Sequence, residues 1–494
     1  MADCFEASTN SEFYQLTNSI TSTTTCINIT AYNVTINGNW FTVEYGNQAS
    51  PSFFAGINIS GYGSATIENI TIVRGAAAAN TVARVSLYAN STRNISISNI
   101  EMQDARNALV LYSVINASIS NISIADVSAK AVWVEGQNIS LRDFTIDSAF
   151  TSMHINNSIG INISDITITS SNDAGIQVQN TSAGNWHNVS LDGSSTYALW
   201  ANNISNMLLQ NISAQFQLYA AYINASTNVT FNSLYANFSD LYSVQVAYSN
   251  AVRFIQSQIQ NTGTGYADLK ISGASNFTVI NDTTLYNLSL QSARFVLVNT
   301  TSGRIDTIGT VTADLVPFWD QIVFDDNLVQ INESLINTSA NITLTSVPIY
   351  ENPAINKDGR ECFDPYCVNL TALDQATVQF NISSMGDYSI EESASITSCG
   401  TLSRDNFGYR LESDLNATGI CLILDADNIT INGQGYTITG DTTSQALQAV
   451  SHTNITFANI TLRNVSQAID LDDITNSTFS NITILNATQS VYAI

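Results

Sequence analysis

The stretch Asn94 to Met102 reads NISISNIEM, and similar phrases follow at Asn116 to Ile124 (NASISNISI) and Asn138 to Ile146 (NISLRDFTI). A variant occupies Gly160 to Ile168 (GINISDITI). A fixed period of 20 to 50 residues is the signature of a repeat architecture. The polar residue at the sixth position of the phrase recurs in steps of 22 or 23 residues, at Asn99, Asn121, Asp143, Asp165, Asn188, Asn211 and Ser233.

Apolar residues alternate with polar ones within each phrase, and the alternation changes phase at the sixth position. In the first copy Ile95 and Ile97 precede that position, while Ile100 and Met102 follow it. Alternation with a period of two is typical of a strand with one buried face. A phase change between two short strands indicates a corner, and Asn or Asp tolerates the left-handed backbone that a corner needs. Stacked corner residues are expected to form a side-chain ladder.

A third strand precedes each phrase, as in Ala131 to Val134 (AVWV) and Ala198 to Ala201 (ALWA). Three strands per repeat predict one coil of a right-handed parallel β-helix with about 22 residues per coil, and roughly 12 to 14 coils fit before residue 310. A leucine-rich repeat has a similar period, but it needs a Leu-dominated consensus and a helix. Here the apolar positions are mostly Ile and Val, and helical spacing is absent.

A larger repeat spans the coils, because the first residues of the chain recur 395 positions later. Cys4 and Cys26 match Cys399 and Cys421, and the NVTING of residues 33–38 matches the NITING of residues 428–433. Between the copies the 22-residue rhythm fails, and alternating stretches indicate a small β-domain. We therefore expect an N-terminal cap and first parallel β-helix at 1–310, a small β-sandwich-like module at 311–395, and the cap and coils of a second β-helix at 396–494.

The six cysteines fall into close pairs, and an even number in a chain rich in glycosylation sequons favours disulfides in an oxidising compartment. Residues one coil apart stack about 5 Å from each other, inside the disulfide range. No apolar run of about 18 residues predicts a membrane span. The start lacks the regions of a signal peptide, so we expect an extracellular, cell-surface protein whose signal has been removed. The predicted pairs are Cys4/Cys26, Cys362/Cys367 and Cys399/Cys421.

The end of the chain stops within a strand-like pattern at Ile494. Either the natural chain extends further or this end docks onto a partner. Fifteen Lys and Arg face forty Asp and Glu, for a net charge of −25. Such a field repels nucleic acid phosphates and anionic lipid headgroups, so we expect neither nucleic acid nor a membrane as partner.

About 35 Asn-x-Ser/Thr triplets are acceptor sequences for N-glycosylation in a secreted protein. Those that begin a strand are expected to be open, whereas Asn121, Asn211, Asn459 and Asn481 sit at the corner and are expected in ladders. The alternative is that NIT and NIS are simply good β-helix sequences. The predicted glycan carriers are Asn28, Asn33, Asn58, Asn94, Asn116, Asn138, Asn228, Asn276, Asn337, Asn454 and Asn476.

The third strand carries an aromatic stripe. If Val132 and Val134 point inward, Trp133 points outward, and the same register exposes His154, Trp200 and Tyr222. Exposed aromatic side chains one coil apart suit stacking on sugar rings or on another subunit. The alternative is that a loop or the small β-domain covers them.

An acidic cluster lies at Asp470, Asp472 and Asp473. Alternation places Asp470 and Asp472 on one face, where they could share a Ca²⁺ through oxygen ligands. Paired carboxylates also serve glycoside hydrolysis. The simpler alternative, a solvated corner in an acidic protein, is favoured, and the three aspartates are only a weak candidate for Ca²⁺. N-linked glycans are the only other group expected, and no metal site is assigned.

A polysaccharide lyase or hydrolase is the main rival to a structural role. A lyase needs a basic group to take a proton from a sugar carbon. The chain has only three lysines, Lys130, Lys270 and Lys357, and none lies near an acid cluster in the repeat register. His154 and His187 are 33 residues apart, which is not a whole number of coils. We therefore expect no enzyme and name no catalytic residue.

The cap phrase, the cysteine spacing and the NITING motif resemble secreted archaeal β-helix proteins of the carbohydrate-binding and sugar-hydrolysis repeat type. Residues 355–388 are similar to a module that accompanies them. The resemblance covers most of the chain, and it implies a component of a surface layer, of a filamentous appendage such as a hamus, or an adhesin.

Exposed coil ends are unpaired sheet edges that need a cap or a partner. We therefore expect a structural or adhesive glycoprotein that self-associates into a filament or lattice, with surface glycans as further partners. The alternative is a polysaccharide-binding or polysaccharide-cleaving β-helix enzyme.

Overall fold

The computed structural model describes residues 3–47, 53–61, 63–75, 84–215, 217–261, 266–273, 275–276, 278–317, 322–332 and 336–493. This part of the chain forms strands, turns and loops and contains no helix. Accordingly, no helix among these residues is long and apolar enough to cross a membrane. The chain divides into two compact units, of which the first comprises residues 1–298 and 310–319 and the second comprises residues 299–309 and 320–494.

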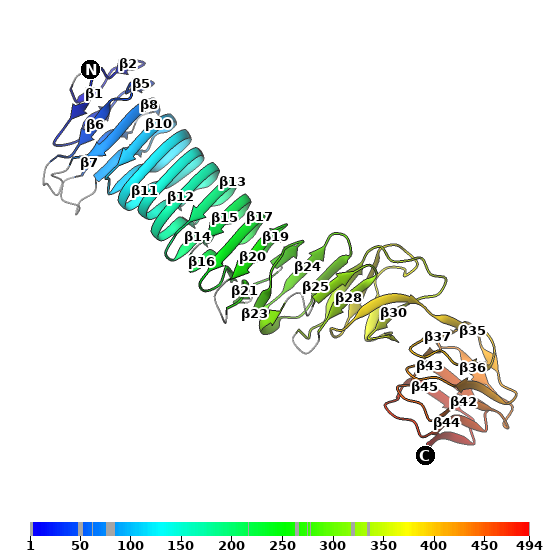
Figure 1. Ribbon diagram of the computed structural model, residues 1–494. Coiled ribbons are helices and arrows are strands. Elements are labelled where there is room, and N and C mark those ends of the chain that lie inside the picture. The colour runs from blue at the N-terminus through cyan, green and yellow to red at the C-terminus, as the bar shows by residue number, and fades with distance from the viewer. Residues whose placement is uncertain are drawn as a thin grey trace. The chain divides into compact units, whose positions relative to one another are not determined.

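The first unit is a parallel β-helix, as predicted, in which strands of successive coils stack into a rod (Figure 1). Within its described residues the strands pair in parallel, except that β26 runs antiparallel to β23. Its strands are β1 (Phe5–Ala7), β2 (Phe13–Gln15), β3 (Ile20–Thr21), β4 (Ile27–Ile29), β5 (Val34–Asn37), β6 (Thr42–Tyr45), β7 (Phe54–Ser60), β8 (Gly63–Arg74), β9 (Arg84–Asn90), β10 (Arg93–Gln103), β11 (Asn107–Asn156), β12 (Ile159–Gln179), β13 (Ser182–Asp192), β14 (Tyr197–Asn202), β15 (Ser205–Gln215), β16 (Tyr219–Asn224), β17 (Thr227–Ser239), β18 (Val244–Ala247), β19 (Asn250–Ile255), β20 (Gln258–Asn261), β21 (Leu269–Ser272), β22 (Thr278–Asn281), β23 (Asn287–Ala293), β24 (Phe295–Asn299) and β26 (Val311–Pro317).

The core of the rod consists of inward columns with one apolar side chain per coil. One column pairs Ile67 with Ile97 and Ile97 with Ile119, and all three are buried. Further along, Phe231 stacks on Phe254 with ring centroids 5.3 Å apart. Burying such a side chain contributes about 1.5–3 kcal/mol, so the alternating pattern supplies the driving force for stacking.

The corners carry the predicted left-handed backbone. Every sixth-position residue from Asn99 to Ser233 has a φ between 51° and 61°. Asn121 Nδ2 donates to Asn99 Oδ1 at 2.8 Å, and Asn99 Nδ2 donates to Asn69 Oδ1 at 2.9 Å. The predicted amide ladder is confirmed.

The expected contrast between corner and strand-start asparagines is wrong. Asn94, Asn116 and Asn138 also have positive φ, from 53° to 59°, because a second corner lies where the third strand meets the phrase. Their side chains stack in the same way, with Nδ2–Oδ1 distances of 3.2 Å between successive coils. A ladder therefore forms at both corners.

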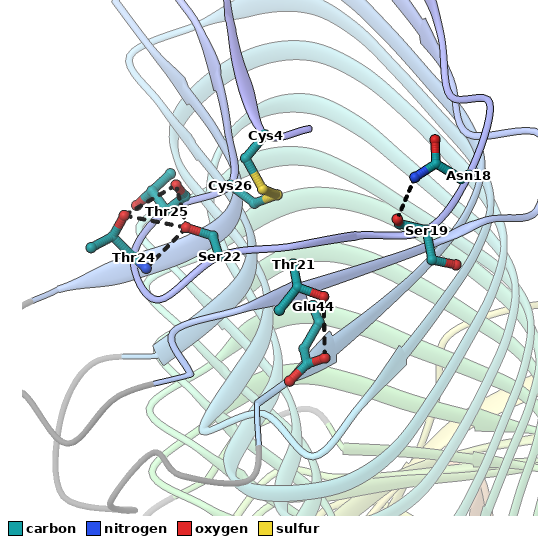
Figure 2. Close-up of a disulfide and its surroundings, with 9 residues drawn as sticks. All are labelled: Cys4, Asn18, Ser19, Thr21, Ser22, Thr24, Thr25, Cys26 and Glu44. Carbon is teal, nitrogen blue, oxygen red and sulfur yellow. Dashed lines mark hydrogen bonds between the residues drawn. A yellow bond between two sulfur atoms is a disulfide. The ribbon is translucent and has the colours of Figure 1, made fainter. Parts of the chain in front are cut away.

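The first disulfide joins successive coils at the start of the rod, as predicted from the 22-residue spacing. Cys4 and Cys26 have Cα atoms 4.7 Å apart. Figure 2 shows this bond together with the hydrogen bond from Thr21 Oγ1 to Glu44 Oε2 at 3.4 Å, which links β3 to β6. The other predicted disulfides also form, between Cys399 and Cys421 and between Cys362 and Cys367.

The second unit begins with a small module of two antiparallel sheets, which fits the predicted sandwich-like fold. Rings of Phe380 and Tyr388, one from each sheet, lie 5.8 Å apart. Residues 299–309 belong to this unit although they precede the predicted boundary at 310, because β25 pairs with β29. The sheets contain β25 (Gly303–Thr307), β29 (Ala340–Leu344), β32 (Cys367–Asn369) and β33 (Val378–Ile382), and β27 (Ile322–Asp325), β28 (Leu328–Ile331), β30 (Pro353–Lys357), β31 (Arg360–Glu361) and β34 (Tyr388–Glu392).

A second parallel β-helix follows in the same unit, as the repeat of the cap predicted. Leu422, Leu447 and Ile469 form one of its inward columns and are buried. Its strands are β35 (Ala394–Ile396), β36 (Gly400–Leu402), β37 (Gly408–Leu411), β38 (Leu415–Asn416), β39 (Ile420–Leu424), β40 (Thr430–Asn432), β41 (Thr437–Thr439), β42 (Gln445–Val450), β43 (Thr456–Arg463), β44 (Gln467–Asp472), β45 (Thr478–Leu485) and β46 (Gln489–Ala493).

Candidate active site on the third sheet

One side of the first unit is a parallel sheet that we call the third sheet. It contains β7, β9, β14, β16, β18 and β21, separate segments of the long strand β11, including residues 107–112 and 151–156, and the C-terminal part of β12. We call its outward-facing residues from Trp133 to Lys270 the outward column; nearer the N-terminus the same sheet also carries the paired Tyr88 and Asn58. The ring of Trp133 meets that of His154 edge-on at 5.8 Å. The column continues, one residue per coil, through His154, Gln177, Trp200, Tyr222, Gln245 and Lys270.

The structure therefore places the predicted stripe of Trp133, His154, Trp200 and Tyr222 in a single column. These side chains are less exposed than the sequence predicted. Both tryptophans and Tyr222 are half-buried, and His154 is only 6% exposed. His154 is buried because Trp133 covers it on one side and Gln177 binds it from the next coil.

A second set of aromatic residues, the tyrosine column, lies beside the outward column. Its rings lie 5.1 Å apart between Tyr197 and Tyr219, 6.3 Å between Tyr219 and Tyr242, and 5.5 Å between Tyr242 and Tyr266. Tyr222 bridges the two columns, 5.8 Å from Tyr197. Sequence reasoning missed this column, although its members recur at steps of 22 to 24 residues.

A charged cluster occupies the end of the outward column nearest the N-terminus. The Lys130 ammonium lies 3.9 Å from the centre of the Trp133 ring. Trp133 Nε1 donates to Glu135 Oε1 at 3.2 Å, and Asn156 Nδ2 donates to the same oxygen at 3.4 Å. Trp133 and Glu135 point outward together because they are two residues apart in β11.

The imidazole of His154 completes this cluster. Its Nδ1 lies 2.8 Å from Gln177 Oε1. A carbonyl oxygen can only accept, so Nδ1 carries the hydrogen and Nε2 keeps its lone pair. We call Lys130, Glu135 and His154, with Trp133 and Gln177 around them, the Lys-Glu-His cluster.

Burial shifts the protonation of both basic groups. It lowers the pKa of the Lys130 ammonium, and the Glu135 carboxylate opposes that shift. Burial is also the main cause of the lowered pKa of His154. The hydrogen bond that His154 donates to Gln177 raises that pKa, the charge of Lys130 lowers it and the charge of Glu135 raises it. His154 is therefore a neutral imidazole near pH 7, with Nε2 able to accept a proton.

The opposite end of the column carries a second cation. The Lys270 ammonium lies 4.4 Å from the centre of the Tyr242 ring and 3.2 Å from its hydroxyl. Two of the three lysines in a chain of net charge −25 thus lie on the third sheet. They offset the negative field locally along the aromatic columns.

The acidic cluster lies at the end of β44. Asp470 is half-buried and accepts a hydrogen bond from Gln448 at 3.1 Å, while Asp472 and Asp473 are exposed. Within the described residues, no group of three or more His, Cys, Asp or Glu side chains is placed to hold a metal ion. Both the Ca²⁺ site and the solvated corner stay predictions.

The predicted glycan carriers differ in exposure and in the partner of Nδ2. Asn28, Asn58 and Asn454 are half-buried, and the other eight are exposed. Nδ2 of Asn58 donates to Asn28 at 2.7 Å, that of Asn228 donates to Asn206 at 2.8 Å, and that of Asn33 donates to Ser11 at 3.3 Å.

No protein family and no curated protein matches the chain. Solved structures with a similar fold include a DFA-IIIase from Arthrobacter chlorophenolicus, at a TM-score of 0.38 and 9% identity, over 54% of this chain and 81% of that one. A second is the A-module of a mannuronan C-5 epimerase from Azotobacter vinelandii, at 0.34 and 8%, over 60% and 87%. A third is an endo-xylogalacturonan hydrolase from Aspergillus tubingensis, at 0.32 and 14%, over 57% and 82%.

These similarities contradict the expectation that the chain is not an enzyme, because they lie among enzymes named for action on carbohydrates. The sequence argument against an enzyme also fails on the structure. It sought a lysine beside an acid cluster in the repeat register, whereas Lys130 acts electrostatically with Glu135 of the same strand and with His154. The strand pairing itself shows that the chain is a parallel β-helix protein.

Proposed function

We propose that this protein is a secreted carbohydrate-active enzyme that binds a polysaccharide along the third sheet and transfers a proton at the Lys-Glu-His cluster. One observation carries the proposal: the cluster lies at one end of the outward column, beside a second column of stacked tyrosines. Flat aromatic faces and a general base are the parts that such an enzyme needs.

The aromatic columns suit a long chain of sugars. From Trp133 to Lys270 the outward column takes six steps, which at about 4.8 Å per coil span about 29 Å. Trp200, Tyr222 and the tyrosine column offer ring faces and edges along this length. The polymer is therefore expected to lie parallel to the rod axis, with its sugar rings against these side chains.

The chemistry of the cluster favours proton abstraction next to a sugar carboxylate. His154 Nε2 accepts the proton from the carbon, and the Lys130 ammonium stabilises the negative charge that develops on the carboxylate. In elimination, the electron pair left on that carbon forms a double bond to the adjacent carbon, whose carbon–oxygen bond breaks, and the oxygen leaves with its electron pair and takes a proton from water. In epimerisation, water instead returns a proton to the opposite face of the carbanion. Hydrolysis by two carboxylates is less supported, since Glu135 is the only acid among the described residues whose charge shifts the pKa of Lys130 or His154.

A screen of acidic and neutral polysaccharides tests the proposal. We expect unsaturated or epimerised products from at least one acidic polymer, and their loss in His154→Gln and Lys130→Met. His187→Gln is the matched control, because His187 is exposed on β13, away from the third sheet. No product from any acidic polymer, or equal activity in His154→Gln, would refute the proposed chemistry.

An extracellular location is part of the proposal. Three disulfides, and the lack of a membrane-spanning helix in the described residues, are compatible with it. Self-association into a filament or lattice stays a prediction, to be tested by the oligomeric state of native material.

A further inference from the structure

The asparagine ladders have a direction. At the second corner Asn116 Nδ2 donates to Asn94 Oδ1, and Asn138 Nδ2 donates to Asn116 Oδ1. Each side-chain nitrogen therefore binds the preceding coil. Asn94 is the first asparagine of this ladder. The residue in register with it on the preceding coil is a serine, Ser64. Ser64 donates its own hydroxyl hydrogen to Asn33.

The three ladder members are otherwise matched. Each is exposed, each has a φ between 53° and 59°, and each opens a sequon. Asn94 and Asn138 even share the triplet Asn-Ile-Ser. They differ in Nδ2: that of Asn138 is held by a ladder bond, whereas that of Asn94 makes no hydrogen bond to any described residue.

N-glycosylation takes place at that nitrogen. Nδ2 forms a bond to C1 of the sugar, the bond from C1 to the phosphate oxygen of a glycosyl phosphate donor breaks, and phosphate leaves with the electron pair. One Nδ2 hydrogen leaves as a proton. The Nδ2 of Asn116 or Asn138 uses one of its two hydrogens in the ladder bond, which holds the amide against the preceding coil and restricts its approach to the donor. The Nδ2 of Asn94 has no such bond to a described residue, so both of its hydrogens are available.

We propose that ladder position selects the glycosylated sequons, so that Asn94 carries a glycan while Asn116 and Asn138 serve as structural ladder residues. The second β-helix contains an independent pair that differs in the same way, although its unbonded asparagine lies at the other end of the ladder. Asn454 Nδ2 donates to Asn428 at 2.8 Å, whereas the exposed Asn476, one coil later, makes no such bond among the described residues. Asn476 is therefore the second residue to which we assign a glycan, and Asn454 is expected to remain a structural ladder residue.

Peptide mapping by mass spectrometry tests this assignment on the full chain secreted from an N-glycosylating host. Occupancy at Asn94 should exceed that at Asn138 about fivefold, the ratio that corresponds to one hydrogen bond. The same ratio is expected between Asn476 and Asn454. Equal occupancy within both pairs would overturn the proposal, as would bare Asn94 and Asn476 in material glycosylated elsewhere.

Two variants of Asn116 separate ladder bonding from other causes. Asn116→Gly removes the acceptor for Asn138 Nδ2 and suits the positive φ, so occupancy at Asn138 should rise toward that at Asn94. Asn116→Asp keeps an acceptor oxygen at the same place, so Asn138 should stay low. Unchanged low occupancy at Asn138 in the glycine variant contradicts the proposal, and the comparison within the unmodified chain stands if either variant is not secreted.

Discussion

The ammonium of Lys130 lies 3.9 Å from the centre of the Trp133 ring, and the indole N–H of the same tryptophan donates to Glu135. Trp133 thus holds a cation on its face and an anion at its edge. Both charges act on His154, which the tryptophan also touches. This relationship joins the proposed sugar-binding surface to the groups proposed to move a proton.

Removal of two aromatic side chains should weaken polysaccharide binding. Trp200→Ala combined with Tyr222→Ala takes away neighbouring rings of the outward column. We expect at least about a tenfold loss of affinity, since the stacking and burial of an aromatic ring contribute on the order of 1–2 kcal/mol per side chain. Isothermal titration or affinity electrophoresis measures the change. Trp40→Ala, which removes an exposed indole from the first coils, is the control and should bind normally.

The activity should persist into mildly acidic solution. Because burial lowers the pKa of His154, its neutral form survives below the ordinary histidine value of about 6.5. The acidic limb of kcat/KM should therefore have its midpoint below 6.5. A midpoint clearly above that value would mean that another group is the base.

The stability of the first unit should fall as the solution is acidified. An unfolded histidine protonates near pH 6.5, whereas folded His154 resists protonation until its lower pKa is reached. The unfolded state thus binds more protons in this window, and the free energy of unfolding decreases as pH falls through it. Thermal melts between pH 7 and pH 5 should show a smaller decrease for His154→Gln than for the unmodified chain. An equal decrease in both would show that His154 titrates normally.

Corner asparagines should contribute both backbone conformation and ladder bonds. Asn99 has a φ of 56° and takes part in two ladder bonds. Asn99→Ala loses both contributions, whereas Asn99→Gly loses only the bonds. The alanine variant should therefore be the less stable of the two by about 1–2 kcal/mol, the cost of a left-handed backbone in an L-residue. Equal urea midpoints for the two variants would show that the corner imposes no such cost.

The fold could be predicted because it repeats. A single alternating phrase with a polar sixth position specifies strand, corner and coil, and each further copy of it supports the same inference. The disulfides followed from the same period, since Cys4 and Cys26 are one coil apart. The boundary near residue 310 was less predictable. The earlier strand, β25, pairs with β29 of the second unit, whereas the later strand, β26, pairs with β23 of the first unit.

The site was only half predictable. Its aromatic stripe follows the 22-residue register, so Trp133, Trp200 and Tyr222 could be aligned in the sequence. His154 follows the same register, whereas Lys130 and Glu135 lie outside it. Both reach Trp133 along its own strand, Lys130 to the ring face and Glu135 to the indole N–H. The burial of His154 depends on side chains from two neighbouring coils, which no single strand pattern reveals.

Proton transfer at a sugar carbon is the central claim, and proton NMR of an acidic polysaccharide incubated with the enzyme in D₂O tests it most directly. The account predicts new vinyl signals or deuterium at the carbon beside the carboxylate, present with the unmodified chain and with His187→Gln and absent with His154→Gln. A polymer that binds the third sheet but keeps every carbon-bound hydrogen would contradict the proposed chemistry and leave this face as a binding surface.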